Sequence, residues 1–113
     1  MSTISTHVLD TARGAPAAGM RVTLEAATAD GWWHLGSAST DDDGRAPRLL
    51  KADEVVQVGT HRLVFETATW FAEQGIAAFY PTVTVAFEIS DATDHYHVPL
   101  LLSPYGYSTY RGS

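Results

Sequence analysis

The chain ends in Tyr110-Arg111-Gly112-Ser113, a segment rich in groups that could do chemistry. It carries a phenol, a guanidinium, a hydroxyl and the terminal carboxylate, all of which can bind a polar small molecule. It follows the strand-like run 100–107 without a linker, so we expect it to be held against ordered structure, with Gly112 allowing a tight backbone turn. A frayed chain end is the simpler alternative for a tetrapeptide taken alone.

The five histidines are the second chemical feature, because the imidazole pKa lies nearest to neutrality. His95 and His97 are two residues apart in a strand-like run, which places both rings on one face of a sheet. His7 lies in another such run and faces away from its apolar neighbours. This spacing fits an acid–base site, a metal site made of imidazoles, or plain sheet surface. In the last case His34 and His61 are also solvated strand residues.

A metal site would need ligands that this sequence supplies poorly. Three histidines and a water can hold a hydrolytic zinc ion. The only carboxylates close to the His95–His97 pair are Asp91 and Asp94, and there is no second His-x-His. The chain has no cysteine, which excludes thiolate ligands, disulfides and a cysteine nucleophile. We therefore predict no bound metal.

Arg45 directly follows the acidic segment Asp41-Asp42-Asp43-Gly44 and opens the next strand-like run. The segment lacks the D-x-[DN]-x-[DN]-G spacing and the closing glutamate of a calcium loop, so it predicts a turn. Arg45 is then either a solvated cation at the start of a strand or a planar, bidentate clamp for an anion or a carbonyl.

The elements that must position these residues have a dominant hydrophobic period of two, which is typical of half-buried strands. About eight strands are predicted, at 4–9, 20–26, 32–37, 45–50, 62–66, 82–89, 96–102 and 105–110. Turn sequences rich in Gly, Asp and Pro separate them. Only 69–74, closed by Gly75, predicts a short helix, with Trp70, Phe71 and Ala72 packing inward. The sequence predicts an all-β, antiparallel sandwich.

Composition limits the class of protein. The 113 residues fit a single domain spanning 1–113, and 45% hydrophobic with 18% charged residues suits a packed core. A net charge of −6 argues against a nucleic-acid partner. No stretch reaches the ~20 apolar residues of a membrane span. The N-terminal segment 1–7 has neither the basic nor the apolar region of a signal peptide, so a cytoplasmic location is expected.

These separate features coincide in one family. The chain resembles the 5-hydroxyisourate hydrolases, transthyretin-related enzymes of urate (purine) breakdown, over nearly its whole length. The resemblance is carried by the segments 5–10 (STHVLD) and 40–45 (TDDDGR), and most densely by 95–113 (HYHVPLLLSPYGYSTYRGS).

The resemblance implies a transthyretin-like sandwich of two four-stranded antiparallel sheets with one short helix. It implies a homotetramer with active sites in the channel between dimers, and hydrolysis of 5-hydroxyisourate to 2-oxo-4-hydroxy-4-carboxy-5-ureidoimidazoline. His7, Arg45 and His97 match the family's catalytic residues, and His7 and Arg45 also its substrate-binding ones. Tyr110 and Ser113 match the tail that closes the pocket. No metal or cofactor is implied.

The implied chemistry suits these side chains. A histidine with a pKa near 6.5 can deprotonate water at neutral pH. We favour His97 as this base with His7 assisting, although the sequence leaves their roles open. Arg45 can orient the substrate and stabilise the oxyanion.

Two other classes of protein compete with the hydrolase. One is a transthyretin-type protein that binds a small aromatic ligand without turnover. The other is a secreted adhesion or sugar-binding sandwich, which the missing signal peptide disfavours. The joint presence of His7, Arg45, His97 and the tail favours the enzyme.

Overall fold

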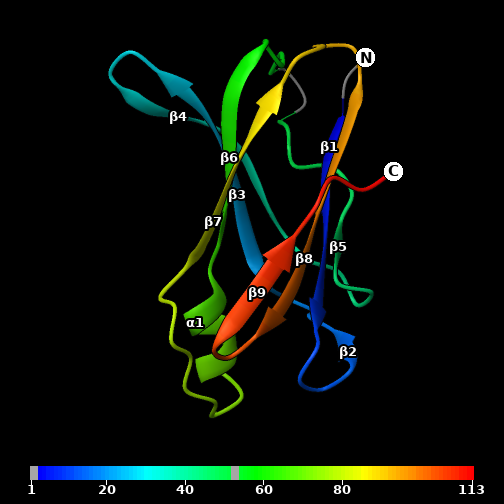
Figure 1. Cartoon of the computed structure of the whole chain (residues 1–113), viewed down its shortest axis with the longest axis vertical. Helices are drawn as coiled ribbons and strands as arrows, with labels where there is room; N and C mark the ends of the chain where they lie inside the picture. The colour runs from blue at the N-terminus through cyan, green and yellow to red at the C-terminus, as the bar shows by residue number, and fades with distance from the viewer. Residues whose placement is uncertain (1–2, 52–53) are drawn as a thin grey trace.

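The computed structural model describes residues 3–51 and 54–113, which form two packed β-sheets and one short helix (Figure 1). The elements in chain order are β1 (Thr3–Asp10), β2 (Ala15–Pro16), β3 (Arg21–Thr28), β4 (Gly31–Ser39), β5 (Arg45–Ala46), β6 (Gly59–Phe65), α1 (Thr67–Ala72), β7 (Val83–Ile89), β8 (His95–Ser103) and β9 (Gly106–Thr109). One sheet has the order β2-β1-β8-β9, with β5 also pairing with β1, and the other has the order β4-β3-β6-β7. The predicted all-β sandwich is confirmed.

The first sheet differs from the predicted one in two ways. It holds five strands instead of four, because the two-residue strand β2, where no strand was predicted, also pairs with β1. It is also not wholly antiparallel, since β1 and β8 run parallel over the eight residue pairs from Thr3↔His95 to Asp10↔Leu102. Parallel neighbours need a long crossover connection. Here all four strands of the second sheet lie between β1 and β8 in the chain, and they form this connection.

Alternating residues of the strands form the core between the sheets. In β8, Tyr96, Val98, Leu100 and Leu102 are buried, whereas His95 is exposed and His97 half-buried on the opposite face. A strand turns successive side chains to opposite faces. Burying the apolar row of β8 therefore places its two histidines together on the outer face.

His61 departs from the predicted solvated position. It is 2% exposed, because it continues the inward-facing row of β6 that includes Leu63 and Phe65. Its Nδ1–H donates to the carbonyl of Gly59 at 3.0 Å, and its ring centroid lies 6.1 Å from that of Phe87. His34 on β4 is exposed, as expected.

The helix α1 begins and ends two residues earlier than predicted, at 67–72 instead of 69–74. Trp70 and Phe71 are buried, and the Trp70 indole N–H donates to the carbonyl of Ala18 at 2.7 Å. Ala72 is exposed, contrary to prediction. Gly75 has φ +74°, the left-handed conformation that favours glycine after a helix.

Strand β5 is shorter than the predicted 45–50. It ends at Ala46 because the next residue, Pro47, has no backbone N–H to continue the ladder. Among the described residues, no helix has both the length and the apolar character needed to cross a bilayer.

Candidate active site

The outer face of the β1–β8 pair carries the two histidines of β8, His95 and His97. The parallel register sets Thr3 beside His95 and Ser5 beside His97. The two histidine rings stack with their centroids 6.3 Å apart and an angle of 12° between their planes. The prediction that His95 and His97 share one face is confirmed.

The acidic segment 41–44 forms a turn, as predicted, and delivers Arg45 to this face. Asp41 Oδ1 accepts hydrogen bonds from the backbone N–H groups of Asp43 and Arg45, both at 2.9 Å. Gly44 has φ +77°, and a Cβ there would lie 2.4 Å from the carbonyl oxygen of Val8. The turn therefore presses closely on β1 and sets Arg45 directly opposite His7 in the β1–β5 pair.

His7 is oriented by the same turn. Its Nε2 lies 2.9 Å from the carbonyl oxygen of Asp43. A carbonyl oxygen only accepts hydrogen bonds, so His7 donates its Nε2–H. In the neutral ring the lone pair then lies on Nδ1, which leaves that nitrogen available to accept a proton or to orient a water.

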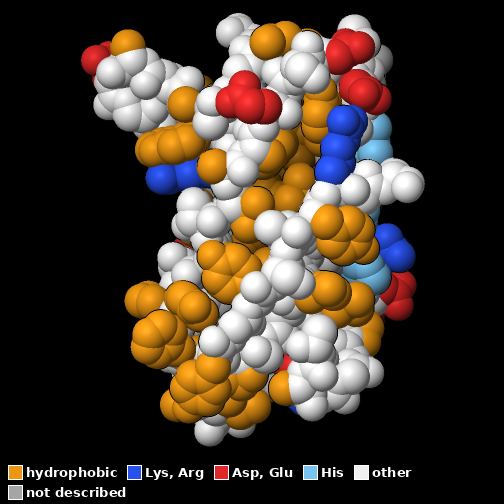
Figure 2. Space-filling model, in the orientation of Figure 1, with side chains coloured by type: hydrophobic (Ala, Val, Ile, Leu, Met, Phe, Trp, Pro, Cys, Tyr) orange, Lys and Arg blue, Asp and Glu red, His pale blue; other side chains and the backbone are white. Residues whose placement is uncertain are grey.

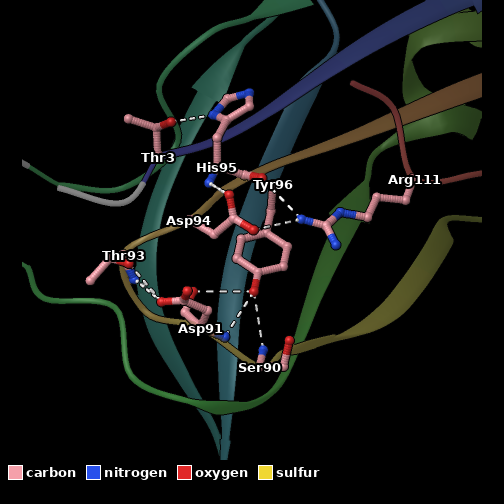
Figure 3. A network of polar contacts seen from close by, with 8 residues as sticks. All are labelled: Thr3, Ser90, Asp91, Thr93, Asp94, His95, Tyr96 and Arg111. Atoms are coloured by element: carbon pink, nitrogen blue, oxygen red, sulfur yellow. Dashed lines mark hydrogen bonds and ion pairs between the residues drawn. The ribbon is translucent and has the colours of Figure 1, made fainter.

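The C-terminal tail is held against β8, which confirms that it is not a frayed end. The N–H of Gly112 donates to the carbonyl of His97 at 2.8 Å. Arg111 lies 3.2 Å from the Asp94 carboxylate, donates to the carbonyl of His95 at 3.3 Å, and stacks 4.6 Å from the Tyr96 ring centroid (Figure 3). Each surface contact is weak alone. Together they fix both ends of the segment 111–112.

One open depression collects several of the predicted site residues. It has a volume of ≈ 230 Å³ and is lined by Ser5, Thr6, Arg45, Pro47, His95, His97 and Ser113. Arg45, His97 and Ser113 were all predicted as site residues, and the fold brings them together from β5, β8 and the tail. His7 lies at the side of this group, opposite Arg45, and does not line the depression.

Tyr110 is the predicted site residue that lies elsewhere in the single chain. It lines a separate, mostly apolar depression of ≈ 310 Å³ together with Val85, Phe87, Val98 and Arg111. Residues along an extended segment turn to opposite sides. Tyr110 and the terminal Ser113 therefore reach different surfaces.

Ser5 lines the depression but was missed from the sequence, and His95 was placed beside His97 without being named as a site residue. A sequence signal for both exists, since Ser5 shares a face with His7 in one strand and His95 shares a face with His97 in another. The pairing of those two strands, which brings the four side chains together, has no local signal.

His97 is tuned towards its neutral form. Burial lowers the pKa of His97 below its ordinary value of 6.5, and the positive charges of Arg45, His95 and His7 lower it further. A hydrogen bond from the ring to the backbone of Ser5 opposes the shift and is the smaller effect. At neutral pH the ring is therefore uncharged and can accept a proton.

This arrangement is suited to hydrolysis of a polar carbonyl compound. A neutral imidazole can deprotonate water, a guanidinium can stabilise the oxyanion, and a second imidazole lies close by. Among residues 3–51 and 54–113, no three His, Asp or Glu side chains are arranged to share a metal ion.

Comparison with known proteins agrees with this geometry. The sequence model of the HIUase/Transthyretin family matches residues 4–112. The 5-hydroxyisourate hydrolase of Mus musculus is 46% identical over 114 residues, covering 99% of this chain and 96% of the mouse protein.

Solved structures give the same picture. The Klebsiella pneumoniae 5-hydroxyisourate hydrolase superposes with a TM-score of 0.85 at 35% identity, covering 98% of this chain and 99% of that one. A transthyretin of sea bream in complex with thyroxine superposes with a TM-score of 0.88 at 28% identity, covering 97% and 94%. On the match over residues 4–112 and this degree of identity, the chain belongs to the HIUase/Transthyretin family.

Proposed function

We propose that this protein is an enzyme of urate catabolism that hydrolyses 5-hydroxyisourate to 2-oxo-4-hydroxy-4-carboxy-5-ureidoimidazoline. The observation that carries the proposal is that Arg45, His97 and Ser113 line one depression, where the lowered pKa of His97 favours its neutral ring. Relatives named 5-hydroxyisourate hydrolase are 44–46% identical to the chain over the aligned residues.

The reaction begins with His97 acting on water. His97 accepts a proton while the water oxygen attacks the carbonyl carbon of the cyclic amide, a role worth roughly 10²–10⁴ in rate. Arg45 binds the substrate and stabilises the negative charge on the carbonyl oxygen, worth about 3–4 kcal/mol for a well-placed donor. The C–N bond then breaks and the leaving nitrogen takes a proton. This opens the ring and leaves a carboxylate on the product.

His97 is the stronger candidate for the base, and His7 assists. The lowered pKa of His97 keeps it unprotonated at neutral pH. His7 donates Nε2–H to a backbone carbonyl, so its free Nδ1 can orient the water or the substrate. Ser113 also lines the depression and contributes a hydroxyl, to which polar substrate groups can bind.

The second candidate is a transthyretin-type protein that binds a small aromatic ligand without turnover. The fold supports it equally well, since transthyretin and hydrolase structures superpose with TM-scores of 0.88 and 0.85. The charged, imidazole-rich depression favours the enzyme, because an aromatic ligand needs mainly apolar contacts.

Freshly generated 5-hydroxyisourate separates the two functions. The hydrolase accelerates the decay of its absorbance well above the spontaneous rate, and His97→Ala abolishes the acceleration. A binding protein leaves the decay unchanged. Equal decay with and without the wild-type protein would overturn the proposal.

A homotetramer with shared sites is part of the proposal. The strands β7 and β9 are the last strands of their sheets, and such edges can pair with another chain. Figure 2 shows hydrophobic side chains gathered at the end of the molecule that holds α1, and Phe79, Tyr105 and Tyr107 are all exposed. Association would cover these rings and allow Tyr110 of one subunit to reach the depression of another. Sedimentation equilibrium should show four chains, and a fully active monomer would contradict the shared site.

We also propose a cytoplasmic location for the protein, which cell fractionation can test.

A further inference from the structure

Ser5 lies on β1 beside the two stacked histidine rings of β8, and its hydroxyl contacts both of them. It is 6% exposed, and its Oγ lies 2.8 Å from His97 Nδ1 and, in a longer contact, 3.4 Å from His95 Nε2. The other nitrogen of His95, Nδ1, contacts the Thr3 hydroxyl (Figure 3). Thr3, His95, Ser5 and His97 therefore form one continuous chain of polar contacts across the β1–β8 pair.

The number of protons limits how this chain can be arranged. A serine hydroxyl has one proton, so Ser5 donates to only one of the two rings and accepts from the other. A neutral imidazole likewise has one N–H and one lone pair. The chain therefore has two directions, and the direction decides which nitrogen of His97 carries the proton.

The first direction makes His97 a base. His97 donates Nδ1–H to Ser5, Ser5 donates to His95 Nε2, and His95 donates Nδ1–H to Thr3. The lone pair of His97 then lies on Nε2, away from Ser5. The second direction reverses every bond, and His97 carries its proton on Nε2, where it is an acid.

We infer that Ser5 and His95 are positioning residues that set the tautomer of His97 and carry its proton to and from solvent. This inference rests on the proposed hydrolase function, in which His97 is first a base and then an acid. No role in catalysis is otherwise assigned to Ser5 or His95.

The proton transfer balances at every atom. When His97 Nε2 accepts a proton from the attacking water, its Nδ1 proton passes to Ser5 Oγ, and the original Ser5 proton passes to His95 Nε2. His97 is again neutral, now with Nε2–H, and His95 is an imidazolium. The Nε2–H of His97 can then protonate the leaving nitrogen, and the reverse transfer from His95 restores the first direction.

The surrounding charges favour moving the proton from His97 to His95. Arg45 and His7 face His97 and disfavour a charge there, as does its partial burial. His95 is exposed, so water can solvate its charge. It is flanked by the Asp94 carboxylate, which accepts from the His95 backbone N–H at 2.8 Å and also pairs with Arg111. Ser113 lines the same depression.

Variants of Ser5 and His95 separate the control of the His97 tautomer from the transfer of its proton. Ser5→Ala and His95→Ala interrupt the chain of polar contacts. His95→Gln offers Ser5 an amide oxygen as acceptor but cannot take up a proton. Ser5→Thr restores the hydroxyl, and His34→Gln on the exposed part of β4 is the matched histidine control. The ¹⁵N chemical shifts of His97 report its tautomer in the substrate-free protein, and turnover of 5-hydroxyisourate gives kcat and KM.

We expect Ser5→Ala and His95→Ala to shift His97 towards Nε2–H and to lower kcat by roughly tenfold or more, with KM changing little. His95→Gln should keep the wild-type tautomer and still lose kcat. Ser5→Thr and His34→Gln should resemble wild type in the tautomer of His97 and in kcat.

Several results would overturn the inference. Unchanged ¹⁵N shifts in Ser5→Ala or His95→Ala would remove the tautomer control, and an unchanged kcat in His95→Gln would remove the proton transfer. If Ser5→Ala fails to fold, Ser5→Thr and the exposed His95 variants still decide the matter. If the wild-type protein lacks turnover, the proposed function fails, whereas the ¹⁵N measurement still tests the tautomer control by itself.

Discussion

Gly112 and His97 are joined so closely that no side chain fits between them. The N–H of Gly112 donates to the His97 carbonyl at 2.8 Å. A Cβ on Gly112 would lie 2.6 Å from His97 Cδ2 and 3.2 Å from Pro99 Cγ. The prediction of a tight turn at Gly112 is wrong, because this residue lies in a β-bridge opposite His97 and not in a turn. The glycine is needed for close approach, which seats the chain end against the candidate base.

Gly112→Ala should therefore lower turnover of 5-hydroxyisourate by about tenfold or more, because the tail or the His97 ring must move. The core is not touched, so the midpoint of thermal unfolding should fall by only a few degrees. Gly106→Ala is the matched control, since its nearest atom would be Ser103 Oγ at 3.7 Å. Equal loss of activity in both variants would show that the contact with His97 is not the cause.

His7→Ala, Arg45→Ala and His97→Ala should each lower turnover by at least ~100-fold, since each removes a proton-transfer or charge-stabilising group. All three side chains lie on the outer face of the first sheet, outside the core. Circular dichroism should therefore show an unchanged fold. His34→Ala serves as a control on the other sheet, and any of the three variants with near wild-type turnover would lose its place in the mechanism.

Activity should fall as the pH drops through the pKa of His97, which lies below 6.5. The base is neutral above this pKa and protonated below it. Replacing Arg45 by Gln removes a positive charge that lowers this pKa, so the acid limb of the pH–rate profile should move to higher pH. Arg13→Gln, in the turn that follows β1, should leave the limb in place. An unmoved limb in Arg45→Gln would contradict the electrostatic coupling.

The lowered pKa of His97 also predicts how the stability of the fold depends on pH. The folded state holds fewer protons on His97 than the unfolded state between the lowered pKa and 6.5. The free energy of unfolding should therefore decrease as the pH falls through this window. His97→Gln should flatten the dependence there, as measured by urea unfolding at several pH values. A dependence of the same slope in His97→Gln would assign it to other groups.

A tag fused after Ser113, or deletion of 111–113, should abolish most activity. Ser113 lines the depression, and added residues would occupy the space of the substrate. A tag before Met1 should do less harm. The test compares turnover and oligomeric state of the two tagged proteins side by side. Equal activity with either tag would show that the chain end is not part of the site.

The sequence by itself determined the local features of this protein. The two-residue hydrophobic period predicted the all-β fold and placed His95 and His97 on one face. The acidic segment 41–44 predicted a turn ahead of Arg45, and both features occur in the structure. Side-chain alternation and turn formation depend on residues only a few positions apart, so a single sequence contains them.

The tertiary structure alone decided which strands meet. The parallel pairing of β1 with β8 joins residues 92 positions apart and sets Ser5 beside His97. It also decided that His61 is buried and that Tyr110 and His97 line different depressions. The partner and register of a strand depend on how the apolar faces of the two sheets pack together. No short segment of the chain carries that information, and it is this packing that assembles the site.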